Sequence, residues 1–566
     1  MGKKFKGGLQ VIKVRLNGFI RLASAGLLAV TMVAGCTGSN NKPPAPTAST
    51  ASEAATTAPG TTAPAAQTEA PKAEVTKLSV EVFDRANQNG TNPTDNYWTD
   101  WIKKEALEKL NLDVSFVSVP RTEELPQLNV LMAGGTPPDI VFTYTQSVPY
   151  NYYKQGGLAD LTDLIDQYGS TIKSYLGDEV LATGQFDGRQ YMVPAKRISR
   201  AMQNTFMRKD WLDALGLPIP QNMDDLYEAM KAFKEKNPGN VDNVIPYSVH
   251  RTGFVGSVQQ IIEAFIDPNA MSDKDRFVLA VEQDNNALGL LYPGFKEGIR
   301  YFNRMYNDGL LDPEFVLIAQ YQDVETKIMR GDVGCWGSNY EEPIRTSPGV
   351  YNQLKEEVPD AEIITLDCFV NPDTGNKVRQ MYRANGIYNF VPASSKNIEG
   401  AVKYLNWLCQ DDVHTYLVIG EEGINHNKDA EGIPVMINLQ NDPRMMNSPN
   451  NLDYALVLNG VDLGNHEKNL KAISKSYEEQ YVDWFMDAYR IATVNAVVYN
   501  PLLVPMEAEA QYIPSLNDKR HEILAAAITA KVADFDSVYD AGIQEWLSIG
   551  GQACVDEREA YWNSTH

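Results

Sequence analysis

The side chains that most often do covalent or metal chemistry are few and scattered in this sequence. Five cysteines occur, and no two of them lie at the C-x-x-C spacing of a zinc or redox site. The six histidines stand singly, and the chain has no G-x-S-x-G, H-E-x-x-H, Walker-type or G-x-G-x-x-G motif. These residues give no indication of a nucleophilic, metal-dependent or nucleotide-dependent enzyme.

One cysteine does stand where chemistry is expected, at the end of the N-terminal apolar run. Residues 1–35 carry six basic side chains and then the apolar stretch "LASAGLLAVTMVAG", which is too short for a bilayer span. This pattern predicts an export signal peptide. "VAGC" resembles the bacterial lipobox, in which the cysteine is acylated and becomes the first mature residue. We therefore expect Cys36 to be lipidated; an ordinary secretory signal with a coincidental cysteine is the alternative.

The segment after Cys36 is low in large apolar residues. Residues 36–75 are rich in Ser, Thr, Ala and Pro, so we expect a disordered tether. Removing the six cations of residues 1–35 shifts the formal charge from -23 to about -29. Such acidity argues against binding to nucleic acid or to anionic lipid headgroups. We expect the protein to lie on the extracellular face of the cell membrane, held there by its lipid.

The other four cysteines are Cys335, Cys368, Cys409 and Cys554. Cys409 lies on the apolar face of "AVKYLNWLCQ" and is interpreted as a core residue. The sequence leaves open whether any of the four pair.

After the tether, the sequence predicts alternating strands and helices, and these elements must position any binding site. "KLSVEVFD" (77–84) and "LDVSFVSVP" (112–120) alternate like strands, and the segment between them has helical spacing. A helix through "EELPQLNVLMA" and a strand at "PPDIVF" follow. Later, helices are predicted in "RKDWLDALG", after the cap Asn222, and from "PASSKN" onward. At 566 residues, this β-α-β opening favours an α/β fold with more than one lobe.

Seven motifs together resemble the family 1 extracellular solute-binding proteins, in the large lipoprotein subgroup of Gram-positive bacteria related to alginate-oligosaccharide-binding proteins. They are, in order, "LNVLMAGGTPPDIVF", "GGLADLTDLIDQY", "FDGRQYMVPA", "FMRKDWLDALGLPIPQNMDDLYEAMKAFK", "YNDGLLDPEF", "VPASSKNIEGAVKYLNWL" and "GEEGINH". The resemblance implies a two-lobed fold of the type II periplasmic-binding-protein kind, each lobe a sheet flanked by helices. It also implies ligand capture in the cleft by hinge closure and delivery to an ABC-transporter permease.

The resemblance further implies that the chain crosses between the lobes several times. We place the crossings near 195–205, near 380–388 and in the 450s. One lobe then comprises residues 76–200 with 386–455, and the other comprises 201–385 with 456–566.

One departure from the subgroup concerns calcium. The subgroup often carries an Asp- and Gly-rich calcium loop where this chain reads "NPGNVDNVIPY" (237–247), with Asp242 as its single carboxylate. A hard cation needs several oxygen ligands, including carboxylates. Calcium affinity is therefore expected to be weak or absent, and no cofactor is predicted.

Sugar recognition uses flat aromatic faces together with amides and arginines that bond hydroxyls. The family places such residues on loops after strands and at the hinge. Asn87, Gln88 and Asn96 in the first such loop are further polar candidates. The predicted ligand-binding residues are Trp98, Tyr144, Arg197, Arg200, Trp336, Asn339, Tyr340, Arg383 and Asn385. Trp336, placed on an open glycine-rich loop, is the strongest single candidate. Trp98 can equally pack in the first turn of its helix, and each arginine can be a solvated charge or a hinge salt bridge.

The sequence thus predicts a monomeric, lipid-anchored receptor that binds a carbohydrate, expected to be an oligosaccharide. No enzymatic activity is predicted, because the chain lacks the common catalytic motifs. The alternatives are a binder of peptides or other non-sugar solutes, a ligand sensor, and a lipid-anchored glycoside hydrolase. The hydrolase stays open because two carboxylates suffice for that chemistry and the chain has 73 acidic residues.

Overall fold

The computed structural model describes residues 75–85, 92–251, 254–281, 289–345, 349–437, 439, 442–445, 448–499, 504 and 506–566. The expected signal peptide, Cys36, the tether as far as residue 74, and Asn87 and Gln88 lie outside the described residues. In the described part of the chain, no helix combines the length and apolar character needed to cross a membrane.

The first sheet begins with the predicted β-α-β unit. Strand β1 (Thr76–Asp84) pairs in parallel with β2 (Leu112–Pro120), and α1 (Tyr97–Leu110) connects them. Leu78, Val80 and Val82 are buried, as their alternation predicts. The next strand, β3 (Val141–Thr143), runs parallel to β1, because Ile140 exchanges backbone hydrogen bonds with Ser79 and Glu81.

The same sheet recruits strands from distant parts of the chain. Their order is β15 (Leu458–Asn459), β6 (Met192–Arg197), β12 (Asn385–Phe390) and β3. Strand β12 is antiparallel to both of its neighbours, and β15 is parallel to β6. The chain therefore leaves this sheet after Arg197, returns at Asn385, and leaves again after Asn459.

The second sheet is built from the intervening sequence. Its order is β10 (Ile363–Thr365), β7 (Gln203–Arg208), β9 (Val333–Asn339) and β8 (Ile245–Ser248). Phe206 of β7 lies opposite Trp336 of β9. The open loop expected around Trp336 is wrong, because this segment is a buried strand.

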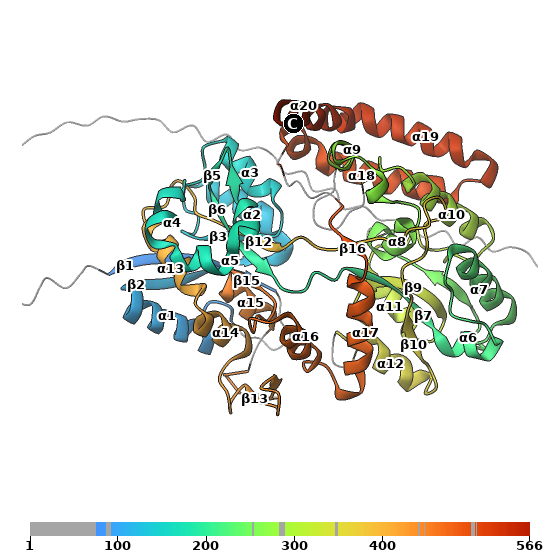
Figure 1. Ribbon diagram of the computed structural model, residues 1–566, viewed down its shortest axis with the longest axis horizontal. Helices are drawn as coiled ribbons and strands as arrows, with labels where there is room; N and C mark the ends of the chain where they lie inside the picture. The colour runs from blue at the N-terminus through green and yellow to red at the C-terminus, as the bar shows by residue number, and fades with distance from the viewer. Residues whose placement is uncertain are drawn as a thin grey trace, which may run out of the picture. The chain divides into compact units, whose positions relative to one another are not determined.

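Helices surround each sheet (Figure 1). Around the first are α1, α2 (Glu124–Ala133), α3 (Ser147–Lys154), α4 (Thr162–Tyr168), α5 (Ser170–Ala182), α13 (Ile398–Leu408), α14 (Asp411–Ile419) and α15 (Ser448–Ala455). With the second are α6 (Lys209–Leu215), α7 (Met223–Lys236), α8 (Phe254–Glu263), α9 (Asp273–Val278), α10 (Phe295–Asn307), α11 (Tyr321–Met329), α12 (Val350–Glu357), α16 (His466–Ser474), α17 (Val482–Thr493), α18 (Glu507–Thr529), α19 (Phe535–Trp546) and α20 (Gln552–Thr565).

Short elements complete the chain. They are the hairpin of β4 (Gln185–Phe186) and β5 (Arg189–Gln190), the pair β11 (Arg379–Gln380) and β16 (Ala496–Val497), the hairpin of β13 (His426–Lys428) and β14 (Pro434–Met436), and the single turns η1 (Arg121–Glu123), η2 (Pro268–Ala270), η3 (Glu342–Ile344), η4 (Glu479–Tyr481), η5 (Val532–Asp534) and η6 (Leu547–Gly551).

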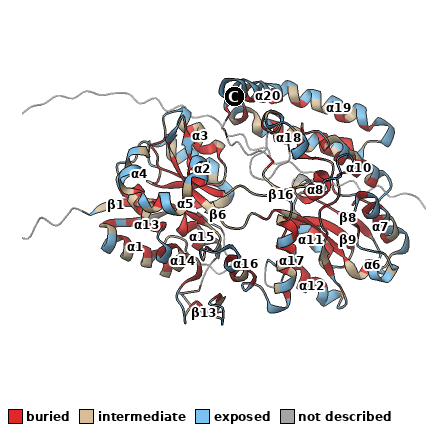
Figure 2. Ribbon diagram, viewed as in Figure 1, coloured by how far each residue is buried: buried red, intermediate tan, exposed pale blue. Residues whose placement is uncertain are grey.

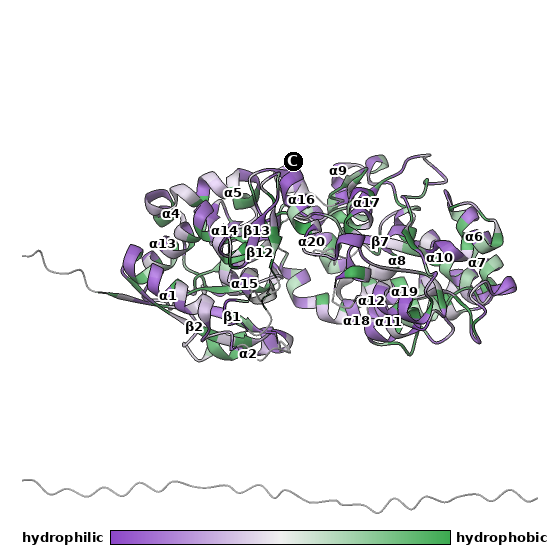
Figure 3. Ribbon diagram, turned by 90° about the horizontal axis from the view of Figure 1, so that it is seen from below, coloured by the Kyte–Doolittle hydropathy of each residue, from purple (hydrophilic) through white to green (hydrophobic). Residues whose placement is uncertain are grey.

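Each sheet has its own core. The strands at the centre of both sheets are buried, while the outer helices expose one side (Figure 2). One cluster joins the first sheet to α1 and α13, and two further clusters lie on the second sheet. The surrounding helices carry both hydrophilic and hydrophobic residues, as amphipathic helices over a sheet must (Figure 3).

The predicted helix ends are confirmed in detail. Gly216 closes α6 with φ 64, which is the left-handed region that favours glycine. Asn222 caps α7 by accepting a hydrogen bond from the backbone N–H of Asp225 at 2.9 Å. Cys409 is buried at the end of α13, which confirms its interpretation as a core residue. Cys335 and Cys368 are likewise buried as thiols.

Candidate functional site

The carboxyl ends of the parallel strands of the first sheet bring charged and aromatic residues together. Arg85 follows β1, Arg121 follows β2 and Tyr144 follows β3. Since β1, β2 and β3 run in the same direction, these residues meet at one edge of the sheet. In open α/β sheets this edge is where ligands bind.

These three side chains form one cluster. Arg85 makes a bidentate ion pair with the buried Asp453, with both N–O distances at 2.7 Å. It also donates to the Tyr144 hydroxyl at 3.2 Å. The guanidinium carbon of Arg121 lies 5.1 Å from the centre of the Tyr144 ring and 4.9 Å from that of Phe83. The cluster holds Tyr144 in a fixed orientation.

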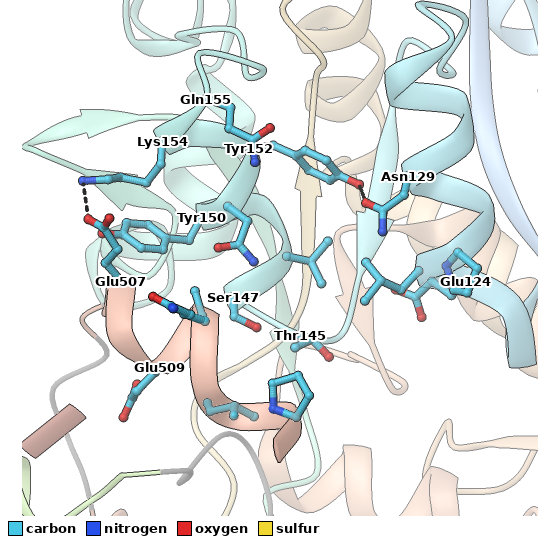
Figure 4. Close-up of a pocket in the computed structure, with 18 of the residues that line it drawn as sticks. Glu124, Asn129, Thr145, Ser147, Tyr150, Tyr152, Lys154, Gln155, Glu507 and Glu509 are labelled. Atoms are coloured by element: carbon cyan, nitrogen blue, oxygen red, sulfur yellow. Dashed lines mark hydrogen bonds and ion pairs between the residues drawn. The ribbon is translucent and has the colours of Figure 1, made fainter. Parts of the chain in front are cut away.

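A pocket of about 820 Å³ opens beside this cluster. One wall comes from η1, α2, α3 and Thr145, and the opposite wall is the first part of α18 (Figure 4). We call it the interlobe pocket. Its lining residues are Arg121, Thr122, Glu124, Leu125, Pro126, Asn129, Thr145, Ser147, Val148, Tyr150, Asn151, Tyr152, Lys154, Gln155, Glu507, Glu509, Ala510, Gln511, Ile513 and Pro514.

The charges on the pocket wall are already paired. Arg121 contacts Glu124, and Lys154 of α3 lies 3.4 Å from a carboxylate oxygen of Glu507 on α18. The Lys154–Glu507 pair therefore links the two walls, and Figure 4 shows it as a dashed line. Because both of its side chains are largely exposed, this ion pair is a weak contact that can break and re-form.

The remaining polar groups of the wall are hydroxyls and amides. The Tyr152 hydroxyl donates to the Asn129 side-chain oxygen at 2.7 Å, an arrangement visible in Figure 4. This leaves the amide nitrogen of Asn129 as a donor beside the pocket. Asn151, Gln155 and Gln511 line the same space. The wall is suited to a neutral ligand rich in hydroxyl groups.

Several predicted site residues gather instead where the chain crosses between the sheets. The Arg197 guanidinium lies over the Tyr382 ring at 4.3 Å, and its Nε donates to the carbonyl of Asn385 at 3.3 Å. Arg200 donates from Nε to the carbonyl of Tyr382 at 2.7 Å. Both arginines therefore hold the two crossing segments together. A hinge contact was one of the alternative roles expected for each arginine.

Three other predicted residues flank the same crossings. Asn339 ends β9 and pairs with Gln203, while Arg383 is half-buried just before β12. Asn385 is 1% exposed, and its side-chain amide has no hydrogen-bond partner among the described residues. A buried amide of this kind is costly unless another group bonds to it.

The predicted aromatic residues lie mainly in the cores. Trp336 is fully buried, and its ring centre lies 5.9 Å from that of Phe206. Tyr340 is buried too, with its hydroxyl 3.1 Å from that of Ser199. Trp98 packs at the start of α1 and donates from its indole nitrogen to the carbonyl of Met445 at 3.2 Å. Tyr144 alone of these aromatic residues adjoins the interlobe pocket.

Sequence reasoning missed most of the pocket wall. It named the end of β3 but not the two helices that follow β2 and β3, although the first turn after such a strand lies at the ligand edge. α2 and α3 contribute most of the first wall. The α18 wall carried no sequence signal, because α18 reaches the pocket from more than 350 residues further along the chain.

A second pocket of about 830 Å³ lies against the first sheet, lined by α5, α14 and residues 462–468. It includes the buried His414 and the ion pair of Lys196 with Asp462 at 2.8 Å. The elements of its wall all flank the first sheet or the segment that leaves it. Unlike this second pocket, the interlobe pocket is also lined by α18 of the second lobe, so it is the better candidate of the two for a ligand site that closes.

Residues 237–247, which stand where the subgroup often carries a calcium loop, do not fit the ion. Asn237 ends α7 with φ 46, and its side chain both accepts from the backbone N–H of Val241 at 3.0 Å and donates to the carbonyl of Val241 at 2.8 Å. The side chain therefore closes its own turn. Asp242 is exposed, and the described residues hold no cluster of three or more metal-ligating side chains.

The chain matches known proteins along most of its length. Residues 90–414 match the family model described as bacterial extracellular solute-binding protein. The polygalacturonan/rhamnogalacturonan-binding protein YtcQ of Bacillus subtilis is 22% identical over 478 residues, which cover 80% of this chain and 86% of YtcQ.

Solved structures share the fold. The alginate-binding protein AlgQ2 without calcium ion aligns with a TM-score of 0.60 and 19% identity, covering 87% of this chain and 99% of AlgQ2. The Streptococcus pneumoniae substrate-binding protein FusA in complex with kestose aligns with a TM-score of 0.60 and 16% identity, covering 86% of this chain and 99% of FusA. The two-lobed α/β fold predicted from the sequence is thereby confirmed.

Proposed function

Because this chain belongs to the family of bacterial extracellular solute-binding proteins, we propose that it captures an oligosaccharide in the interlobe pocket and delivers it to the permease of an ABC importer. The named relatives and neighbours bind polygalacturonan, rhamnogalacturonan, alginate and kestose, which supports a carbohydrate as the solute class.

The single observation that carries the proposal is the composition of the pocket wall. Its volume of about 820 Å³ falls within the usual range of about 300–1,000 Å³ for small-molecule sites. Amides and hydroxyls from α2, α3 and α18 line it, and its described cations are already paired with carboxylates. Tyr150, which is half-buried, offers an aromatic face that a sugar ring can stack against.

Closure of the two lobes would trap the ligand. A ligand between α2–α3 and α18 contacts both walls only when they are close, so it favours the closed state by the contacts that the open state lacks. We assign the hinge to the crossing segments, where Arg197 and Arg200 bond the segment at Tyr382. In this assignment the hinge residues are Arg197, Arg200, Asn339, Arg383 and Asn385, and none of them is among the residues that line the interlobe pocket.

We propose the lobe division expected from the sequence, 76–200 with 386–455 and 201–385 with 456–566, except that the last crossing follows Asn459. Strand pairing supports it, since β6 and β12 belong to the first sheet and β7 to the second. β15 still pairs with β6, which extends the first lobe through Asn459.

We also propose that Cys36 is acylated and holds the protein on the extracellular face of the membrane. Two acyl chains supply the hydrophobic energy that stable anchoring needs. Mass spectrometry of protein taken from cells tests this directly. A diacylated N-terminal cysteine is expected, and an unmodified N-terminus at another residue would leave a freely secreted binder.

The proposed function is tested by a thermal-shift screen. A ligand that binds only the folded protein must raise its melting temperature. We expect a rise with members of a panel holding oligogalacturonides, rhamnogalacturonan fragments, kestose and neutral hexose oligomers, and no rise with a peptide panel. A rise with peptides alone would show that the solute is a peptide and not a carbohydrate. Hydrolysis of a panel sugar over hours would instead indicate a glycoside hydrolase.

A further inference from the structure

One face of α18 forms the second wall of the interlobe pocket. Glu507, Ala510, Gln511 and Pro514 all line the pocket. Their spacing of three, four and seven residues places them on the same side of the helix. The opposite side, which includes Leu516 and Ile523, is buried in the second lobe. The rotation of α18 about its axis is therefore fixed by its own core contacts.

Pro514 lies in the interior of this helix and changes the backbone hydrogen bonding on the side that faces the pocket. Proline has no N–H, so the carbonyl of Ala510, four residues earlier, cannot receive its regular helical hydrogen bond. A backbone carbonyl that lacks this bond remains a strong acceptor for another donor. Ala510 and Pro514 both line the pocket, so the helical turn that contains this carbonyl borders the pocket.

The first turn of α18 is held in place by two adjacent residues of α20. Met506, the N-cap residue, makes no side-chain capping bond. The carboxylate of Glu557 instead accepts from the backbone N–H groups of Glu507 at 2.9 Å and Ala508 at 2.7 Å. A carboxylate at this end of the helix is also favoured by the helix dipole.

The next residue of α20 completes the attachment. Arg558 makes a buried ion pair with Glu509, with N–O distances of 2.6 and 3.1 Å, and donates to the carbonyl of Phe277 at 2.8 Å. Arg558 is 4% exposed and Glu509 is 9% exposed. Glu557 and Arg558 thus fix the position of the pocket wall from a helix that begins some forty residues further along the chain.

We propose that the carbonyl oxygen of Ala510, released from its helical hydrogen bond by Pro514, accepts a hydrogen bond from a hydroxyl group of the bound oligosaccharide, and that Glu557 and Arg558 are positioning residues for it. The inference rests on the proposed function. It assigns a specific contact to the α18 wall, which complements the amide donors of the α2 wall.

Pro514→Ala tests the contact, because it restores an N–H that can bond to Ala510. The variant is expected to melt at a higher temperature, since alanine is far better than proline in a helix interior. It should nevertheless bind the best oligosaccharide of the panel about five- to tenfold more weakly, the loss expected for one hydrogen bond. Ser515→Ala is the matched control: it improves helix propensity one residue away, outside the pocket lining, and should leave affinity unchanged.

Mono-deoxy analogues of the same oligosaccharide separate this hydrogen bond from lost contact with the proline ring. One analogue should bind the wild-type protein more weakly and show no further loss in Pro514→Ala, because both changes remove the same bond. The proposal would be overturned if Pro514→Ala bound every analogue more weakly than the wild-type protein did, and by the same factor. It would also be overturned if Pro514→Ala bound the parent oligosaccharide with wild-type affinity.

Glu557→Ala tests the positioning role against Glu559→Ala, which removes an exposed ion pair with Lys274 from the same helix. Hydrogen exchange at Glu507 and Ala508 should accelerate in Glu557→Ala alone, and affinity should fall in that variant alone. Faster exchange with unchanged affinity would restrict Glu557 to a structural role and contradict this part of the proposal. If the wild-type protein binds no oligosaccharide, the proposed function itself fails, which is a distinct outcome.

Discussion

Glu81 is a buried carboxyl group on β1, close to the residues that line the interlobe pocket. It is 1% exposed, and one of its oxygens accepts from the backbone N–H of Phe142 at 3.2 Å. Burial raises the pKa of Glu81 to about 8, with smaller contributions from Glu124 and Asp453 that act in the same direction. Glu81 is therefore protonated in the folded protein at neutral pH.

The pKa of Glu81 predicts a pH dependence of stability. Below about pH 4.5 both the folded and unfolded states hold the proton; between about 4.5 and 8 only the folded state does, so the free energy of unfolding falls as pH rises. Glu81→Gln should be more stable than the wild-type protein at pH 8, by an amount that shrinks toward pH 5, whereas the exposed Glu123→Gln should show no such trend. Urea unfolding at pH 5 and at pH 8 measures the difference in the free energy of unfolding between the variant and the wild-type protein. A difference that is the same at both pH values would contradict the raised pKa of Glu81.

Trp336 illustrates why residue type alone does not place a side chain. If Trp336 contacted a sugar from an open loop, Trp336→Ala would weaken sugar binding by about 1–3 kcal/mol, as for a buried aromatic contact. In the structure the indole is part of the second lobe's core against Phe206. We now expect Trp336→Ala to lower the free energy of unfolding by about 3–5 kcal/mol. Urea unfolding tests this; full stability with lost affinity would return Trp336 to the ligand site.

Among the helices and strands, local patterns predicted several elements of both lobes well. The alternation of β1 and β2, the cap at Asn222 and the glycine at 216 each depend on a few neighbouring residues, and each is present. β9 was misread because its glycines suggested a loop. A Cβ atom at Gly337 would lie 1.8 Å from the carbonyl oxygen of Ser257, so glycine there permits the close approach of α8. That requirement appears only in the folded chain.

The candidate site was predicted less completely, for a physical reason. Tyr144 was found because it follows a recognisable strand. The α18 wall and the Arg85–Asp453 ion pair join residues hundreds of positions apart, and no local pattern encodes such contacts. The hinge arginines were named from the resemblance, and their contacts with the segment at Tyr382 became visible only in the structure.

The turn after α7 carries a prediction about calcium. Because the Asn237 side chain closes the turn through Val241, stability should not depend on the ion. Melting temperatures in calcium and in EDTA should agree, while Asn237→Ala should lower the free energy of unfolding by about 1–2 kcal/mol in both conditions. A melting temperature that falls by several degrees in EDTA would show that the loop, or another site, does bind calcium.

In the molecule as a whole, the proposed ligand site has two walls that come from different lobes. α2 and α3 follow strands of the first sheet, and α18 packs on the core of the second. The Lys154–Glu507 pair joins them weakly enough to open. A ligand that bridges the walls should therefore order both of them together, whereas a ligand at any site on one lobe should affect that lobe alone.

Hydrogen exchange with and without the best oligosaccharide of the panel distinguishes a ligand that bridges both walls from a ligand that binds one lobe. We predict that residues 121–155 and 507–514 both exchange more slowly when the sugar is bound, since these segments line the interlobe pocket. Protection confined to one wall, or centred on α5, α14 and residues 462–468 around the second pocket, would show that the sugar does not bind between the two walls of the interlobe pocket.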